Sequence, residues 1–157
     1  MAGPTAFKLG LTQDTASRLK GQKANMDREI EACEGGQAPV ANRGDLFWIE
    51  ADASRGSIPG VPHPYVVIQE DVLNHSRVST VVVCALSSNL TKTTEPGNVL
   101  LEPGEGNLDK QSVVVVSQVS CLYKTRLGKR IGALSSQRVE QILAGMRFQQ
   151  ASYFHRQ

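Results

Sequence analysis

Three side chains close together in the sequence, Arg55, Ser57 and His63, are of the types that bind and react with anionic groups. Arg55 carries a planar, permanently charged guanidinium, Ser57 carries a hydroxyl, and His63 carries an imidazole, the group most often used for proton transfer. Prolines and glycines surround them and restrict the path of the chain. An arginine beside a glycine and a serine in such a loop indicates recognition of an anion, with phosphate the first candidate.

Two predicted strands flank this loop and must position it. The segment from Asp45 to Glu50 carries large apolar residues that fit a pleated, largely buried strand, and the chain returns into a second strand near Pro64. Binding and catalytic residues are often found on loops held by a rigid pair of strands. We expect Asp45 to fix the start of its strand by hydrogen bonding rather than to act in catalysis, because aspartate favours turns.

Several further short strands are predicted after this pair. Dense runs of valine, isoleucine and leucine between turn residues place them at residues 65–69, 80–86, 98–102 and 112–119. The continuous valine runs indicate strands that are covered on both sides for part of their length. This pattern favours a small barrel or sandwich over alternating βαβ units.

The last part of the chain changes to a helical period. Ser135 can cap a helix, and Leu134 is placed to pack against the first turns. The apolar face has i, i+3, i+4, i+7 spacing: Val139, Ile142, Leu143, Met146. The expected fold class is therefore mostly β with a C-terminal α-helix that covers an open end or face of the barrel.

Three regions are distinguished by their composition. Residues 1–42 form a polar N-terminal extension with few large apolar residues, expected to be helical or disordered. Residues 43–150 form the barrel domain, and residues 151–157 form a tail. The formal charge of +2 is only mildly basic, so any nucleic-acid site must be local.

Composition also narrows the class of protein. No apolar run is long enough to span a bilayer and the N-terminus does not resemble a secretory signal, so we expect a cytoplasmic protein with no membrane partner. The three cysteines are widely spaced and form no C-x-x-C pair. This argues against a disulfide framework and a zinc site, and we expect neither a metal nor a cofactor.

Several motifs in order resemble the MazF/PemK family of toxin ribonucleases. Between Arg43 and Phe148 they are R-G-D-L-F-W-I, S-R-G-S, P-Y-V-V-I, V-V-V-C-A-L-S-S, S-V-V-V-V-S-Q-V and K-T-R-L-G-K-R-I-G-A-L-S. The resemblance implies a small SH3-like barrel of the CcdB/PemK type that forms a homodimer. It further implies metal-independent, sequence-selective cleavage of single-stranded RNA, usually mRNA, and a cognate MazE-like antitoxin as partner.

The resemblance also assigns site residues. The loop arginine of the family corresponds to Arg55, its strand-end hydroxyl residue to Ser87, and its glutamine after the valine strand to Gln118. This chain departs from the family at Ile58, where many relatives carry glutamate, and at His63, where they commonly carry arginine. The general base of the family pattern is therefore missing.

Metal-free cleavage of RNA needs a base for the 2′-hydroxyl, an acid for the leaving oxygen and donors for the phosphorane. Arg55 suits the last role but not the first, because arginine does not deprotonate in proteins. Ser87 can donate a hydrogen bond to a phosphate oxygen or orient the 2′-hydroxyl. We hypothesise that His63 takes part in the proton transfers; the alternative is a loop histidine that is only satisfied by a backbone hydrogen bond.

Other residues are candidates for contact with RNA. The dense basic cluster at residues 124–130 either follows the RNA backbone or is a solvated loop, and residues 88–96 are expected to form a flexible loop over the groove. Gln118 either binds a base edge or is structural. The predicted RNA-binding residues are Ser57, Ser88, Asn89, Lys92, Gln118, Lys124, Arg126 and Lys129.

Three other interpretations stay open at this point. The first is a toxin of the same fold that binds DNA gyrase, although it would not need Arg55 and Ser87. The second is an inactive SH3-like interaction module, which the missing glutamate at Ile58 favours. The third is a metal- or thiol-dependent enzyme, which the scattered cysteines and histidines make a poor candidate.

Overall fold

The computed structural model of the 157-residue chain describes residues 38–50 and 61–154. The chain separates into two compact units, residues 1–37 and 38–157, and the described residues all belong to the second. Arg55, Ser57 and Ile58 of the predicted loop therefore lie outside the described residues, as does most of the predicted N-terminal extension. Among the described helices, none is long and apolar enough to cross a membrane.

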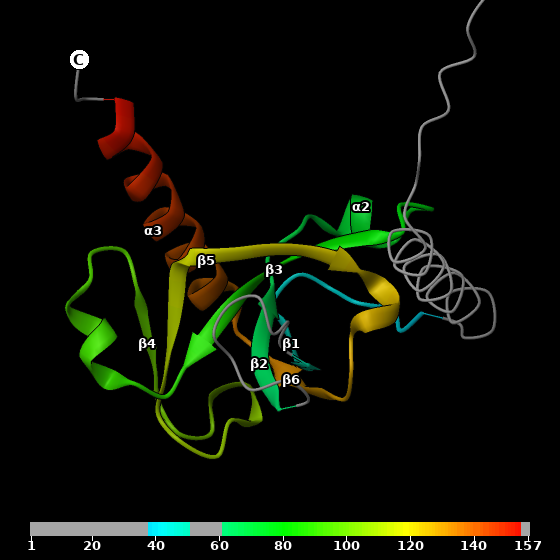
Figure 1. The fold of residues 1–157 in the computed structure, drawn as a ribbon, viewed down its shortest axis with the longest axis horizontal. Coiled ribbons are helices and arrows are strands. Elements are labelled where there is room, and N and C mark those ends of the chain that lie inside the picture. Colours follow the sequence, from blue (N-terminus) through cyan, green and yellow to red (C-terminus); the bar gives the residue numbers. More distant parts are fainter. Residues whose placement is uncertain (1–37, 51–60, 155–157) are drawn as a thin grey trace, which may run out of the picture. The chain divides into compact units, whose positions relative to one another are not determined.

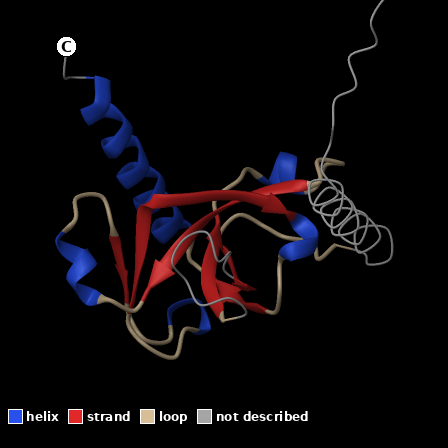
Figure 2. Cartoon of the chain, in the orientation of Figure 1, coloured by secondary structure: helices blue, strands red, loops and turns tan. Residues whose placement is uncertain are grey.

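Within the described residues, six strands form one antiparallel sheet that curls into a half-barrel, and a long helix packs beside it (Figures 1 and 2). The strand order is β4-β5-β3-β2-β1-β6. The strands are β1 (Asp45–Glu50), β2 (Pro62–Val67), β3 (Thr80–Ser87), β4 (Val99–Leu101), β5 (Ser112–Tyr123) and β6 (Arg130–Ala133). The predicted fold class, mostly β with a C-terminal helix, is confirmed.

The central strands are buried on both sides of the sheet. In β2, Val66 belongs to one apolar cluster and Val67 to another, and Cys84 and Val83 of β3 divide in the same way. This follows from the pleat, which sends successive side chains to opposite faces. The larger cluster, here called the main core, contains Val66 and Cys84 together with Ile142 of the helix. The predicted coverage of the valine-rich strands on both sides is confirmed.

The C-terminal helix α3 (Ser136–Phe154) forms as the sequence pattern predicts. The hydroxyl of Ser135 accepts a hydrogen bond from the Arg138 N–H at 3.3 Å, which is the expected N-terminal cap. The four predicted apolar residues and Leu134 all pack in or against the main core. A Cβ on Gly145 would collide with the backbone of Gly97, so the helix lies directly on the chain that leads into β4. Residues 151–154 of the predicted tail are helical.

The structure corrects several predicted boundaries. The edge strand β6 was not predicted, because its four residues contain only one large apolar side chain. Strand β2 begins at Pro62 rather than at residue 65, and β5 extends to Tyr123. A short helix, α2 (Asp71–Asn74), lies between β2 and β3. The segment expected as a flexible loop over the groove contains an ordered 3-10 helix, η2 (Leu90–Thr94).

Candidate active site

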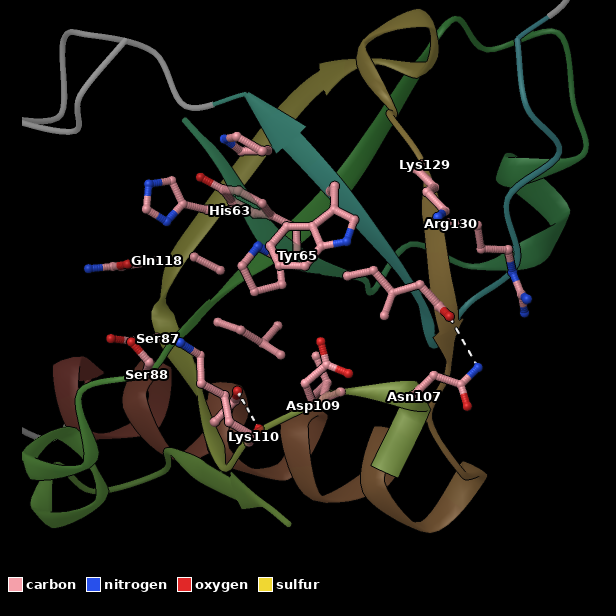
Figure 3. A pocket seen from close by; sticks show the side chains of 18 of the residues that line it. His63, Tyr65, Ser87, Ser88, Asn107, Asp109, Lys110, Gln118, Lys129 and Arg130 are labelled. Atoms are coloured by element: carbon pink, nitrogen blue, oxygen red, sulfur yellow. Dashed lines mark hydrogen bonds between the residues drawn. The ribbon is translucent and has the colours of Figure 1, made fainter. Parts of the chain in front are cut away.

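A pocket of about 740 Å³ lies where five of the six strands contribute residues to one surface. Its walls come from β1, β2, the end of β3, η2, the segment before β5, β5 itself and β6 (Figure 3). The polar residues that line it are His63, Tyr65, Ser87, Ser88, Lys92, Asn107, Asp109, Lys110, Ser112, Gln118, Lys129 and Arg130. Residues far apart in the sequence are thus brought together at this pocket.

The pocket contains several residues that the sequence singled out. The predicted site residues that line it are His63, Ser87, Ser88, Lys92, Gln118 and Lys129. Arg55 and Ser57 lie outside the described residues. Their segment leaves the described chain at Glu50 and returns at Val61, and Glu50 pairs across the hairpin with Pro62, which lines the pocket.

Ser87 is the last residue of β3 and is half-buried. Its hydroxyl oxygen accepts a hydrogen bond from the Asn89 N–H at 3.1 Å. A hydroxyl has one donor and two acceptor positions, so the Ser87 O–H stays available for a bound molecule. The Asn89 side chain accepts hydrogen bonds from the Thr91 N–H and hydroxyl at 3.1 and 2.7 Å and does not line the pocket. Asn89 therefore caps η2.

A large bulge in β5 positions Gln118. Cys84 pairs with Val119 and Leu86 pairs with Val114, so two residues along β3 are matched by five along β5. The extra residues leave the ladder, and Gln118 is exposed beside the pocket (Figure 3). Bulges of this kind redirect side chains and are frequent near active sites.

Asn98 stabilises this bulge. Its side-chain oxygen accepts a hydrogen bond from the Val116 N–H at 3.1 Å, and its amide donates to the Lys92 carbonyl at 2.9 Å and to the Glu95 carboxylate at 3.1 Å. One side chain therefore joins the bulge that carries Gln118 to the 3-10 helix that carries Lys92. The sequence analysis gave Asn98 no role.

Positive charge predominates along the pocket. Lys92, Lys110, Lys129 and Arg130 line it together with one carboxylate, that of Asp109. Lys92 pairs with Glu95 at 3.4 Å and Arg130 with Asp45 at 2.8 Å, whereas Lys110 and Lys129 form no ion pair within the described part of the chain. Two lysines are thus available to attract an anion.

The Asp45–Arg130 pair is structural. The buried carboxylate of Asp45 accepts hydrogen bonds from the Asn42 N–H at 2.9 Å and from Arg130 Nη2 at 2.8 Å. The hydrogen bond from Arg130 to Asp45 raises the pKa of the guanidinium, and the charge of Asp45 acts in the same direction. Asp45 therefore fixes the start of β1 against β6, as predicted from its sequence context.

His63 lies on β2 opposite Ile49 and is half-buried at the pocket (Figure 3). In residues 38–50 and 61–154, no hydrogen bond occupies its ring. The alternative, a histidine held by a backbone hydrogen bond, also stays open, because residues 51–60 of the same loop lie outside the described residues. The part of His63 in proton transfer stays a prediction.

Two predicted RNA contacts lie elsewhere. The buried ammonium group of Lys124 donates to the carbonyls of Leu73, Asn74 and Ser76 at 3.4, 2.7 and 3.3 Å, at the end of α2. We therefore leave Lys124 out of the proposed RNA surface. Arg126 lines a neighbouring hollow and donates from Nη2 to the Glu50 carbonyl at 3.1 Å.

Sequence reasoning missed other parts of the pocket. Trp48 was expected to be buried in its strand, yet its side chain is 37% exposed and lines the pocket. Asn107 and Asp109, in the segment before β5, were not predicted as site residues; Asn107 donates to the Ile131 carbonyl at 3.1 Å, which holds this segment against β6 (Figure 3). Alternation along β1 gave no signal for the exposure of Trp48, because Leu46 on the same face is buried in the main core.

Solved structures of similar fold support the assignment of the architecture. An endoribonuclease from a mycobacterial species has a TM-score of 0.58 at 16% identity and covers 74% of this chain and 96% of its own. The structure of MazF from Deinococcus radiodurans has a TM-score of 0.58 at 17% identity and covers 72% and 98%. These likenesses establish the fold.

Sequence comparison gives the family. The endoribonuclease MazF6 of Mycobacterium tuberculosis is 33% identical over 108 residues, which is 69% of this chain and 95% of the relative. The endoribonuclease MazF of Staphylococcus saprophyticus is 32% identical over 103 residues, 66% of this chain and 85% of the relative. The model of the PemK-like, MazF-like toxins matches residues 42–149. The chain therefore belongs to the PemK-like, MazF-like toxins of type II toxin-antitoxin systems.

Proposed function

We propose that this protein is the toxin of a toxin-antitoxin pair and acts as an endoribonuclease on single-stranded RNA, usually mRNA, without a metal ion. The observation that carries the proposal is the cationic pocket that brings His63, Ser87 and Gln118 together from three strands. The names of the relatives, endoribonucleases, point to the same activity. Within residues 38–50 and 61–154, no group of acidic, histidine and cysteine side chains is arranged to hold a metal.

The proposed reaction is transfer of the phosphoryl group to the neighbouring 2′-oxygen. The 2′-hydroxyl gives up its proton as its oxygen bonds to phosphorus, and the bond from phosphorus to the 5′-oxygen breaks as that oxygen gains a proton. The products are a 2′,3′-cyclic phosphate and a 5′-hydroxyl. Each proton transfer needs a positioned acid or base, and the phosphorane needs donors.

Ser87 and Arg55 are proposed to stabilise the phosphorane. The Ser87 hydroxyl keeps its donor because its recorded hydrogen bond, from Asn89, uses only an acceptor position. Arg55, assigned by family resemblance, supplies a permanent charge that suits phosphate. Lys110 and Lys129 attract the RNA backbone to the pocket, since they have no ion-pair partner among the described residues.

His63 is proposed to exchange protons with the substrate. Its ring lines the pocket without a hydrogen-bond partner in the described part of the chain. It is the only histidine that does so within that part, since His75 binds Asn42 Oδ1 at 2.8 Å. Gln118 is proposed to bind a base edge, because its exposed amide offers both donors and acceptors beside the same pocket.

The partners follow from the proposed function. A cognate MazE-like antitoxin would cover the cationic pocket with an acidic segment and so exclude RNA. Solved relatives include a mycobacterial endoribonuclease in complex with its cognate antitoxin, and MazE-MazF from Deinococcus radiodurans. We also propose that the toxin is a homodimer, since two-fold pairing is the commonest way to bury apolar surface, and that it acts in the cytoplasm.

The test is cleavage of a long unstructured RNA by the purified protein in EDTA, with identification of the product ends. The proposal expects cyclic phosphate and 5′-hydroxyl ends that disappear with Arg55→Ala. The matched control is Arg77→Ala, because Arg77 is exposed and does not line the pocket. A folded Arg55→Ala protein that still cleaves would remove this arginine from the mechanism.

His63 needs a separate experiment. If it exchanges protons, His63→Gln lowers the cleavage rate and removes an ionisation from the pH–rate profile. An unchanged profile would exclude His63 from the proton transfers. Absence of cleavage by the folded wild-type protein, across many RNA sequences, would refute the ribonuclease and lead to a test of gyrase binding.

A further inference from the structure

A second hollow of about 410 Å³ adjoins the pocket. Trp48, Pro62 and Lys129 line both, so the two hollows are neighbours and Trp48 lies at their boundary. The other wall of the second hollow is formed by the end of β1 and by residues 125–128, which precede β6. Nothing in the proposed cleavage reaction uses either Trp48 or this hollow.

The backbone of Trp48 is fixed on both edges of its strand. Its N–H donates to the Lys129 carbonyl at 2.9 Å, and its carbonyl accepts from the Gly128 N–H at 3.0 Å. On the other edge it pairs with Pro64 of β2. A Cβ on Gly128 would collide with the Trp48 carbonyl, so the turn lies directly against the strand. A half-exposed aromatic ring on such a rigid support loses little conformational entropy when another ring stacks on it.

The charges around Trp48 suit a nucleic-acid strand. Lys129 stands at the boundary shared by the two hollows, and Arg126 lies in the second (Figure 3 shows Lys129 on the pocket side). Aromatic surface beside cations is the arrangement by which proteins hold single strands, with bases stacked and phosphates on the cations. Glu50 in the second hollow repels phosphate but accepts hydrogen bonds from the amino group of a base.

We propose that the second hollow is a nucleotide subsite next to the cleavage pocket and that the indole of Trp48 is the platform on which the base of that nucleotide stacks. The inference rests on the proposed ribonuclease function, because it needs single-stranded RNA to pass through the pocket. The Glu50 carboxylate offers only acceptors, so the subsite suits a base edge that donates hydrogen bonds, such as an exocyclic amino group.

The sole tryptophan of the chain makes the subsite directly observable. A short 2′-O-methyl RNA, which lacks the attacking hydroxyl, should change the fluorescence of Trp48 as it binds. Its binding, followed separately by anisotropy of a dye on the RNA, should weaken roughly 5- to 150-fold with Trp48→Ala and much less with Trp48→Phe. Phe148→Ala is the matched control, because Phe148 is 55% exposed on α3 and lines neither hollow.

A scan of abasic positions in the RNA separates stacking from a structural effect. If Trp48 stacks on one base, removing that base weakens binding to the wild-type protein but has no further effect on Trp48→Ala. Equal losses at every position in both proteins would overturn the subsite. Tight binding of RNA without a change in Trp48 fluorescence would also overturn the subsite. A fluorescence change with the antitoxin but none with RNA would do the same. Neither result would refute the proposed ribonuclease activity. Failure of the wild-type protein to bind or cleave any RNA would refute the ribonuclease as well.

Discussion

Replacing Asn98 by alanine should affect both stability and cleavage. The change removes the acceptor of the Val116 N–H and the donor to the Lys92 carbonyl and Glu95. Val116 is 3% exposed, so water does not readily replace the lost acceptor. An unsatisfied buried donor costs about 1 to 3 kcal/mol. For a domain of this size we expect the melting temperature to fall by roughly 5 to 10 °C.

Asn74 provides a matched control for this change. It also makes three hydrogen bonds with its side chain, donating to the Gln69 carbonyl and Asp71 and accepting from Gln69 Nε2, at 2.9, 3.0 and 3.0 Å. It is buried and does not line the pocket. Asn74→Ala should therefore lower the free energy of unfolding to a similar extent.

The two variants should differ in their reaction with RNA. Asn98→Ala removes the side chain that ties the bulge with Gln118 to the 3-10 helix with Lys92, so we expect KM to rise several-fold at a temperature where both variants are folded. Asn74→Ala should keep the wild-type KM. Thermal unfolding and steady-state cleavage of one RNA measure both effects. An equal KM in the two variants, or an unchanged melting temperature in Asn98→Ala, would refute the reasoning.

Three further predictions concern single groups. Ser87→Ala should slow single-turnover cleavage roughly 100- to 1000-fold, the usual cost of one transition-state donor, while leaving the melting temperature nearly unchanged; wild-type rates would exclude the hydroxyl. Burial raises the pKa of the Cys84 thiol to about 12, so an alkylating reagent at neutral pH should modify exposed Cys121 and spare Cys84 until the protein unfolds, which peptide mapping can check. The hydrogen bonds from Arg138 lower the pKa of Glu105 below its ordinary value of 4.5, so the stability from this pair is complete above that pH and is lost as the pH falls through the lowered pKa. Glu105→Gln should therefore destabilise the protein at neutral pH and reduce the loss of stability on acidification, as followed by denaturant unfolding; a variant with the wild-type pH dependence would contradict this.

The strands were predictable where burial alone decides the structure. The valine runs of β3 and β5 and the apolar face of α3 are long enough for their period to be visible in the sequence. The short strand β6 was not, because Gly132 is required there by the close approach of Gly106, a contact that only the folded chain contains. Pairing with β1, rather than its own composition, makes β6 a strand.

Site residues were predictable from the sequence only where the side chain itself indicates a chemical role. Ser87 and His63 have side chains that suit phosphate and proton transfer, and both line the pocket. The roles of Lys124 and Asn98 depend on which carbonyls and N–H groups lie nearby. A lysine in a basic cluster looks solvated in the sequence, yet Lys124 is buried because three carbonyls at the end of α2 surround its ammonium group. Tertiary hydrogen bonding of this kind has no local signal.

The sheet pairs independently on the two sides of the bulge in β5, so the exposed bulge residues at the pocket take no part in the pairing. On one side the register is set by Cys84 with Val119, and on the other by Leu86 with Val114. A deletion or insertion between these anchors changes which side chain faces the substrate, while both ladders keep their own pairing. Val115 and Val116 keep the buried side of the bulge in the core, so changes confined to exposed Ser117 and Gln118 can alter the pocket surface without rebuilding that core. Ser117 and Gln118, the two exposed residues of the bulge, are where a designer should vary this scaffold to redirect its choice of RNA.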